Sequence, residues 1–479
     1  QSPREKGKRK HWDDALKAMQ AHFKGLKATG GAGLALLMDA TPSPTLRHQV
    51  QALKKALPQL RVYVDDPAWP ESHHAGMALL GFERANLLYK LDKAKVVLAV
   101  DADPLGVDGD SVRNAQQFSV ARFQEPDMDR TRSWMTRLYA VEPHFSLTGQ
   151  TADNRLRASG RLCGRFLVAL AAQLQKDGVD LGMPSQPATE IQRWAQAMAA
   201  ETGKKAERFL AWPRELSHEL RFNREKAAVI VGPRQPAWAH ALAYVINLAL
   251  QNVGHKRPTM LVPDPEARFD GTLADLTREL KAKRVQTLLM LGTNPVYTAP
   301  VDVNFKRLLS GVALSIHLAT HVDETSARCT WHLPMTHYLE AWGDLRASDG
   351  TVSIQQPLIA PLHDAWSPVS LLARLLGGKA TGHEALKAFW KNQTQGAGFD
   401  DRWQKWLHEG VTDLATPRPT KPTPEPERLD AALKGLPAPT RPKGIELVFA
   451  LDSKLYDGRY ANNAWLQELP DTHSKLTWD

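Results

Sequence analysis

Cysteine is nearly absent from this chain, which has only Cys163 and Cys329 among its 479 residues. Two thiolates cannot supply the four ligands that an iron–sulfur cluster or a structural zinc site usually requires. A disulfide between them is the alternative, but nothing in the sequence indicates that they meet. We therefore expect two buried thiols.

Long hydrophobic runs are also missing. A membrane-spanning helix needs about 20 apolar residues, and the best run, Ala241–Leu250, is interrupted by Tyr244 and Asn247. The composition, 43% hydrophobic and 24% charged, is that of an ordinary globular protein. We expect any membrane association to depend on partners.

No glycine fingerprint for phosphate is present. Gly30–Gly33 precedes an apolar run, whereas a phosphate-binding loop follows a strand and opens a helix. The absence of such a loop disfavours an ordinary NAD or ATP site. The net charge of +9 includes a basic cluster at Arg4–Lys10. Without aromatic residues between the basic ones, this cluster predicts a solvated segment and no nucleic-acid partner.

Histidines and carboxylates do not form a metal-binding motif. His332 and His337 have Pro334 between them, so they do not share a helix face as an HExxH pair does. The other histidines considered are His73, His74, His321 and His363, all expected to be structural or on the surface. Carboxylates along one long connection are expected to cap helices and fix turns. They are Asp323, Glu324, Glu340, Asp344 and Asp349.

Apolar runs alternate with amphipathic segments in the first half of the chain. Gly33–Ala40, Arg61–Val64 and Ala94–Val100 predict strands, and the spacing of Leu46, Val50, Leu53 and Leu57 predicts a helix between the first two. This alternation is typical of a parallel sheet.

The pattern restarts later, so we expect two similar α/β units. The segments that carry this second pattern are Ala227–Val231, Trp238–Val253, Thr259–Val262, Leu273–Lys283, Val285–Leu291 and Val312–Leu318. Asp101–Pro104 and Gly292–Pro295 are predicted to occupy equivalent places, each a polar turn after a strand. Ligands of α/β sheets bind at the carboxyl ends of strands, which makes the stretch Leu288–Pro361 a candidate site.

The predicted organisation is a basic segment at 1–28, a first α/β domain with a helical extension at 29–225 and a second α/β domain at 226–415. A Pro-rich linker at 416–444 and the beginning of a β domain at 445–479, with a strand at Glu446–Leu451, follow. Because both ends look unnatural, we expect a piece of a longer polypeptide.

The stretch Leu288–Pro361 carries a family resemblance. It contains GTNP, DETSARCTWHLP, HYLEAWGD, ASDGT and QQP in this order, and resembles the molybdopterin oxidoreductase superfamily. It is most similar to the iron–sulfur and molybdopterin-like B subunits of alternative complex III. Further matching segments are Gly30–Leu46, Val96–Leu105, Arg137–Asn154 and Asp457–Trp478.

The resemblance implies two Rossmann-like parallel-sheet domains and the start of a C-terminal β-barrel. It implies a scaffold without a cofactor of its own in a complex that oxidises quinol and passes electrons to cytochrome c or an oxidase. Iron–sulfur clusters and haem c are expected in partners, namely an iron–sulfur module, a multihaem cytochrome c and integral membrane subunits. The implied location is the periplasmic face of the inner membrane.

Three alternatives remain open. The first is an active molybdopterin enzyme, with Asn294, Glu340 and Asp344 near the cofactor and Ser72 as a possible neighbour of the metal. The second is a nucleotide-binding α/β enzyme, and the third is an independent binding module. If the chain is the scaffold that the resemblance implies, we expect no catalytic, cofactor-binding or metal-binding residue in it.

Overall fold

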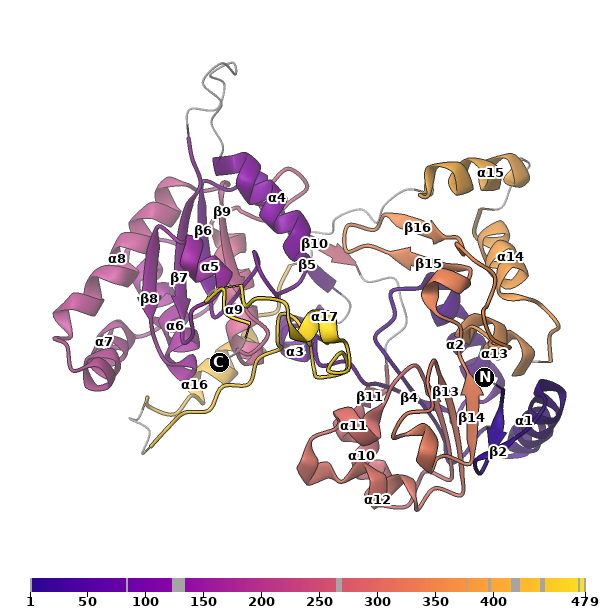
Figure 1. The fold of residues 1–479 in the computed structure, drawn as a ribbon. Helices are drawn as coiled ribbons and strands as arrows, with labels where there is room; N and C mark the ends of the chain where they lie inside the picture. The colour runs from indigo at the N-terminus through magenta and orange to yellow at the C-terminus, as the bar shows by residue number, and fades with distance from the viewer. Residues whose placement is uncertain are drawn as a thin grey trace. The chain divides into compact units, whose positions relative to one another are not determined.

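The computed structural model describes residues 2–82, 85–122, 134–263, 269–375, 377–394, 398–414, 423–439, 444–472 and 474–477. The chain divides into two compact units, each made of separate stretches (Figure 1). Unit 1 comprises Gln1–Trp69, Pro265–Thr416 and Asp457–Arg459. Unit 2 comprises Pro70–Asp264, Pro417–Tyr456 and Tyr460–Asp479.

Unit 1 is built on an eight-stranded sheet with the order β11-β4-β3-β12-β13-β14-β1-β2. The six strands from β11 to β14 in this order are parallel, and β1 and β2 are antiparallel at one side. The bounds are β1 Arg4–Glu5, β2 Lys8–Arg9, β3 Leu34–Met38, β4 Arg61–Val64, β11 Gly271–Thr272, β12 Thr287–Leu291, β13 Leu314–Ala319 and β14 Trp331–Pro334.

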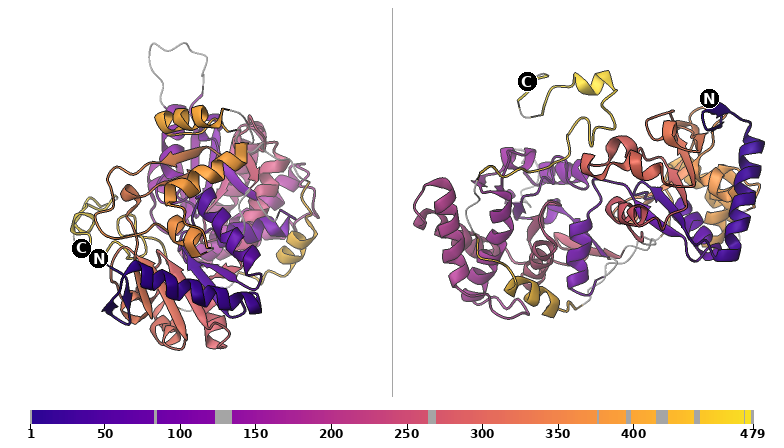
Figure 2. Two further views of the ribbon diagram at one scale, coloured as in Figure 1. Left: turned by 90° about the vertical axis from the view of Figure 1, so that its right-hand side faces the viewer. Right: turned by 90° about the horizontal axis from the view of Figure 1, so that it is seen from below.

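Helices cover both faces of this sheet, which explains why its central strands are apolar throughout. Leu36 and Leu289 pack into one core with α1, α2 and α13, whereas Leu37 and Leu288 pack into another with α10 and α12. Two further views show α1, in indigo next to the N-terminus, along the outside of unit 1 (Figure 2). The helices are α1 Trp12–Leu26, α2 Pro44–Ala56, α10 Leu273–Lys281, α11 Pro295–Thr298, α12 Phe305–Leu309, α13 Pro368–Leu375, α14 Gly382–Thr394 and α15 Phe399–Glu409. The hairpin β15 Gly343–Arg346 and β16 Val352–Gln355 and the 3-10 helices η1 Lys27–Thr29, η3 Val301–Val303, η4 Ser326–Arg328 and η5 Tyr338–Glu340 complete the unit.

Unit 2 contains a four-stranded parallel sheet with the order β8-β7-β6-β9. Its strands are β6 Val96–Val100, β7 Arg137–Glu142, β8 Asn154–Arg157 and β9 Ala227–Val231. A separate antiparallel pair joins β5 Ala85–Tyr89 to β10 Thr259–Pro263. Val97 and Phe118 of α4 share one core, and Leu98 packs with α6–α9 in the other. The helices are α3 Glu71–Leu79, α4 Ser111–Arg122, α5 Leu147–Thr151, α6 Gly160–Lys176, α7 Thr189–Thr202, α8 Glu207–Phe222, α9 Ala237–Ala249, α16 Glu427–Lys434, α17 Ala464–Gln467 and η2 Leu91–Lys93.

The predicted α/β fold with parallel sheets is confirmed, but the strands combine differently. The sequence order places Ala94–Val100 in one sheet with Gly33–Ala40 and Arg61–Val64, whereas β6 pairs with β7 and β9. Strands β3 and β4 instead join β12–β14. Unit 1 is therefore interrupted by most of unit 2, in contrast to the expected consecutive domains. Hydrophobic periodicity shows where strands form and does not show how they pair.

The expected strand at Glu446–Leu451 is wrong. Residues 445–450 form no regular secondary structure, and Ile445 and Phe449 are 93% and 84% exposed. No buried face forms here to hold a strand, so the beginning of a barrel is not observed in the described residues. The predicted basic segment at 1–28 and the predicted Pro-rich linker at 416–444 each contain a packed helix. Helix α1 buries Trp12 and Phe23 in unit 1, and α16 buries Leu429 in unit 2. No helix in the described part of the chain is long and apolar enough to cross a bilayer.

Candidate functional site

Several strands of the unit 1 sheet end side by side, and polar residues follow them. Asp39 follows β3, Asp65 follows β4 and Gly292–Pro295 follows β12. Because these strands are parallel and adjacent, their carboxyl ends lie at one edge of the sheet. We call Asp39, Asp65 and Gly292–Pro295 the unit 1 edge.

The two carboxyl groups of this edge are poorly compensated. Burial, together with the charge of the neighbouring Asp39, raises the pKa of Asp65 to about 7. Burial also raises the pKa of Asp39 to about 6, while Arg459 opposes this shift. Asp65 is 8% exposed and accepts no hydrogen bond through its side chain from the described residues. These two acids are thus held where their charge is unfavourable.

Arg459 comes to this edge from the far end of the chain. Its Nη1 lies 3.4 Å from Asp39 Oδ1. Its Nε and Nη2 donate to the two carboxylate oxygens of Asp457, both at 2.9 Å. The guanidinium is therefore bound mainly by Asp457, and it compensates Asp39 only partly.

The Gly292–Pro295 turn is closed by hydrogen bonds of the chain itself. Gly292 has φ +75°, which favours glycine. Asn294 Nδ2 donates to Glu324 Oε2 at 2.9 Å, and Asn294 Oδ1 accepts from Thr325 Oγ1 at 2.6 Å. Thr325 Oγ1 in turn accepts from Val296 N at 3.0 Å. The amide of Asn294, one of the residues predicted to lie near a cofactor, is thus used to fix the loop.

Sequence reasoning missed His317, which lies behind the turn. It is fully buried in β13, with Nε2 2.7 Å from Thr293 O and Nδ1 2.9 Å from Ser326 Oγ. Ser326 Oγ also lies 2.9 Å from His332 Nδ1. Burial lowers the pKa of both rings, to about 4 for His332. A histidine inside an otherwise apolar strand was the sequence feature that could have identified it. In the structure its neutral ring supports the Gly292–Pro295 turn.

Asp344 and Glu340 also hold the fold, as expected for carboxylates in this connection. Asp344 is 1% exposed and accepts from Ser43 Oγ at 2.5 Å, from Trp390 Nε1 at 2.9 Å and from Thr45 Oγ1. Glu340 accepts from the backbone N–H groups of His337 at 3.0 Å and Leu362 at 3.1 Å. Ser72 belongs to α3 of unit 2, in a different unit from Asn294, Glu340 and Asp344.

Unit 2 has a comparable set of acids at its own sheet edge. Asp101 follows β6, Asp103 lies just beyond it, and Glu142 ends β7. We call these three residues the unit 2 edge. Asp101 Oδ1 accepts from Arg234 Nη2 at 2.8 Å, and Asp101 Oδ2 accepts from Gln235 Nε2 at 2.8 Å.

The other two acids of the unit 2 edge are also fully used. Asp103 Oδ1 accepts from the N–H and the hydroxyl of Thr148, at 2.9 and 2.7 Å. Glu142 accepts from Arg155 Nε at 2.5 Å and from Ser146 Oγ. Each carboxylate of this edge thus has at least two donors.

The cysteines are buried and free, as predicted, and they lie in different units. Burial raises the pKa of Cys329 to about 12 and that of Cys163 well above its usual range. Neither thiol is therefore activated as a thiolate. Among the described residues, no group of three or more His, Cys, Asp and Glu side chains is placed to hold a metal ion.

The fold is α/β with a parallel sheet in each unit, and it resembles that of a solved enzyme. Acetylene hydratase from Pelobacter acetylenicus superimposes with a TM-score of 0.57 and 13% sequence identity, over 78% of this chain and 59% of the hydratase. At this identity the likeness concerns the fold alone. No family model matches the sequence.

A curated relative is similar in sequence as well. The molybdopterin-binding-like subunit of menaquinone reductase from Nitratidesulfovibrio vulgaris is 24% identical over 420 residues, which is 81% of this chain. The match covers 58% of that subunit, so the chain spans little more than half of its relative's length.

Proposed function

We propose that this chain is a molybdopterin-like scaffold, without a cofactor of its own, in a respiratory electron-transfer complex that reacts with quinone or quinol. The match to the menaquinone reductase subunit carries the assignment to a complex of this kind. The arrangement of charge at the unit 1 edge supports the absence of a cofactor.

A pterin cofactor does not fit the charges of this edge. The cofactor carries a phosphate or pyrophosphate, so its site needs cations or free backbone N–H groups. The groups that act on Asp65 are three further acids, Asp39, Asp66 and Asp457, and one cation, Arg459. That cation is already bound by Asp457. An anion would meet mainly like charge here.

Part of the polar turn of the same edge is already used by the chain itself. The Asn294 side chain is held by Glu324 and Thr325, and the Val296 N–H is taken by Thr325. The unit 2 edge has Arg234 as a cation, but Asp101 binds it through Oδ1 and through its backbone oxygen. We therefore assign both edges to support of the fold.

In its finer form, the proposal places the chain in alternative complex III, on the periplasmic face of the inner membrane. Its partners are then an iron–sulfur module, a multihaem cytochrome c and integral membrane subunits that oxidise quinol. The chain contributes a rigid surface that holds these modules at electron-tunnelling distance. The clusters and haems of the partners carry the electrons.

The cofactor assignment is tested on the complete protein, produced in cells that make molybdopterin enzymes. Molybdenum and tungsten are measured by elemental analysis, and pterin fluorescence is measured after oxidative denaturation. We expect less than about 0.05 metal or pterin per chain. An active molybdopterin enzyme purified from the same cells is the positive control, and near-stoichiometric metal and pterin in this protein would contradict the scaffold assignment.

The assignment to a complex is tested separately by purifying the chain from its native membranes in mild detergent. We expect haem c and iron–sulfur signals to co-elute with it in optical and EPR spectra. Recovery as a protein without either signal would favour an independent binding module.

A further inference from the structure

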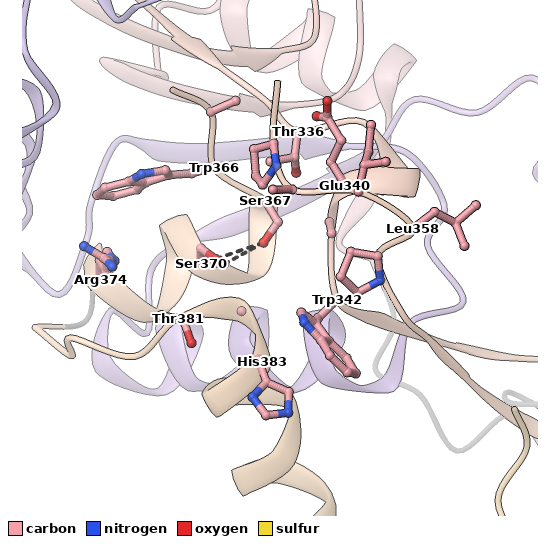
Figure 3. Close-up of a pocket in the computed structure, with 17 residues that line it drawn as sticks. Thr336, Glu340, Trp342, Leu358, Trp366, Ser367, Ser370, Arg374, Thr381 and His383 are labelled. Atoms are coloured by element: carbon pink, nitrogen blue, oxygen red, sulfur yellow. Dashed lines mark hydrogen bonds between the residues drawn. The ribbon is translucent and has the colours of Figure 1, made fainter. Parts of the chain in front are cut away.

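Unit 1 contains a pocket of about 650 Å³ to which no function has been assigned above (Figure 3). It lies between the loop that follows β14, the segment that follows β16 and the first residues of α13 and α14. Small-molecule sites typically measure about 300–1,000 Å³. The pocket is thus large enough for an organic ligand.

One wall of the pocket is a stack of aromatic rings and a cation. Trp366 stacks on Trp12 with ring centroids 4.0 Å apart and planes within 4°. On Trp366 lies the guanidinium of Arg374, 4.3 Å from the ring centroid. Figure 3 shows Trp366 and Arg374 on the same side of the pocket. The stack holds the Arg374 side chain in one place.

Arg374 forms no ion pair or side-chain hydrogen bond with the described residues, although its charge acts on the exposed carboxylate of Glu384. Its Nε is buried without a hydrogen-bond partner. A buried N–H group without an acceptor is costly. An anionic ligand would remove this cost.

The same pocket also contains a buried hydroxyl group without a hydrogen-bond partner. Thr336 is 7% exposed, and its Oγ1 is buried without a hydrogen bond. Ser367 Oγ donates to Ser370 Oγ at 3.0 Å, between Thr336 and Arg374 in Figure 3. A Cβ at Gly382 would lie 3.1 Å from Ser370 Oγ and 3.2 Å from Ser367 Oγ, so a larger residue would crowd these two hydroxyls.

The opposite side of the pocket is apolar. Trp342 faces it, with His383 4.4 Å from the Trp342 ring, and Leu358 is 76% exposed at its rim. Glu340 also lines the pocket, but its carboxylate is held by the N–H groups of His337 and Leu362. This fixed negative charge disfavours a ligand with several anionic groups.

We propose that this pocket binds a small organic anion. Its single carboxylate or phosphate meets the guanidinium of Arg374 and the Thr336 hydroxyl, and its ring packs against Trp342 and Leu358. The site is separate from the unit 1 edge, and the proposal does not depend on the proposed function.

The probe is 8-anilinonaphthalene-1-sulfonate, whose fluorescence rises in an apolar site, with neutral N-phenyl-1-naphthylamine as its uncharged counterpart. We expect Arg374→Gln to weaken binding of the sulfonate about tenfold and Thr336→Val about threefold. Binding of the neutral probe should change less than twofold in both variants. Arg307→Gln, on an exposed turn of α12, is the matched control and should change neither probe.

Thr336→Val keeps the shape of the side chain and removes only the hydroxyl without a partner, so it remains informative if Arg374→Gln fails to fold. Equal sulfonate affinity in Thr336→Val and the unsubstituted protein, or equal weakening of the neutral probe, would overturn the proposal. Competition by benzoate or phenyl phosphate then distinguishes a carboxylate from a phosphate ligand. Failure of both to displace the sulfonate would also overturn it.

Discussion

The two sheet edges of this molecule carry acids in corresponding places but surround them differently. In unit 2, Asp101, Asp103 and Glu142 each accept two or more hydrogen bonds. In unit 1, Asp65 accepts none through its side chain from the described residues, and Asp39 has only the 3.4 Å contact with Arg459. The donors, and not burial alone, decide whether a buried acid stabilises its surroundings.

The difference also shows at which edge a carboxylate can be removed with the smaller loss of stability. A buried carboxylate with good donors is costly to remove, because its partners lose their bonds. One without donors opposes folding whenever it is ionised. The carboxylates of the unit 2 edge therefore stabilise the fold, whereas those of the unit 1 edge destabilise it when they are ionised.

The largest effect is expected for Asp101→Asn in unit 2. The substitution leaves Arg234, whose side chain is 16% exposed, without its carboxylate, and breaking a buried pair of this kind costs about 3–5 kcal/mol. Asn tolerates the positive φ of 47° at this position, so backbone strain would not be the cause of the loss of stability. Hydrogen exchange of β6 amides measures the opening free energy of unit 2. Adding Arg234→Met should restore part of the loss, and a change below about 1 kcal/mol would contradict the comparison.

Asp344→Ala tests whether the effect of a buried acid on stability depends on the unit in which it lies or on its hydrogen-bond donors. Asp344 belongs to unit 1 but has donors on Ser43, Thr45 and Trp390, so it should behave like the acids of unit 2. We expect a loss of about 2–3 kcal/mol in the opening free energy of β3 amides, because buried donors are left without an acceptor. Trp390→Phe removes one donor and should cost about 1 kcal/mol. A neutral result for Asp344→Ala would refute the role of the donors.

Asp65→Asn should have a smaller effect of the opposite sign. The folded pKa of about 7 lies above the unfolded value near 3.8, so the folded state holds the proton more tightly. Asp65 costs nothing well below pH 4, where both states are protonated, and stability is lost as the pH rises from about 4 to about 7. The variant should therefore gain about 1–2 kcal/mol at pH 8 and nothing at pH 4.

Urea unfolding at the two pH values measures this gain. Asp302→Asn, an exposed acid of the same unit, is the control and should show no difference between pH 4 and pH 8. Destabilisation by Asp65→Asn at pH 8 would mean that the carboxylate has a partner that stabilises it.

Much of the candidate site was visible in the sequence, and part of it was not. Gly292–Pro295 was predicted as a polar turn at the end of a buried strand, and it is one. Asp39 and Asp65 could have been found by the same rule, because each follows a buried strand directly. Arg459 could not, since it reaches Asp39 from 420 residues away. Arg374 was hidden for the same reason, because the stack with Trp366 and Trp12 joins distant segments.

The sequence by itself determined the local elements. Continuous apolar runs specify strands buried on both faces, and the helical spacing of apolar residues specifies the layers that cover them. The scarcity of cysteine already excluded a cluster bound by this chain's thiolates alone.

Only the tertiary structure decided which strands pair, and hence that unit 1 is made of stretches that lie before and after most of unit 2 in the sequence. It also decided which buried acids have donors and which do not. The physical reason is the same in both cases. Strand pairing and the pKa of a buried group depend on neighbours that are distant in sequence, and local patterns carry no information about them.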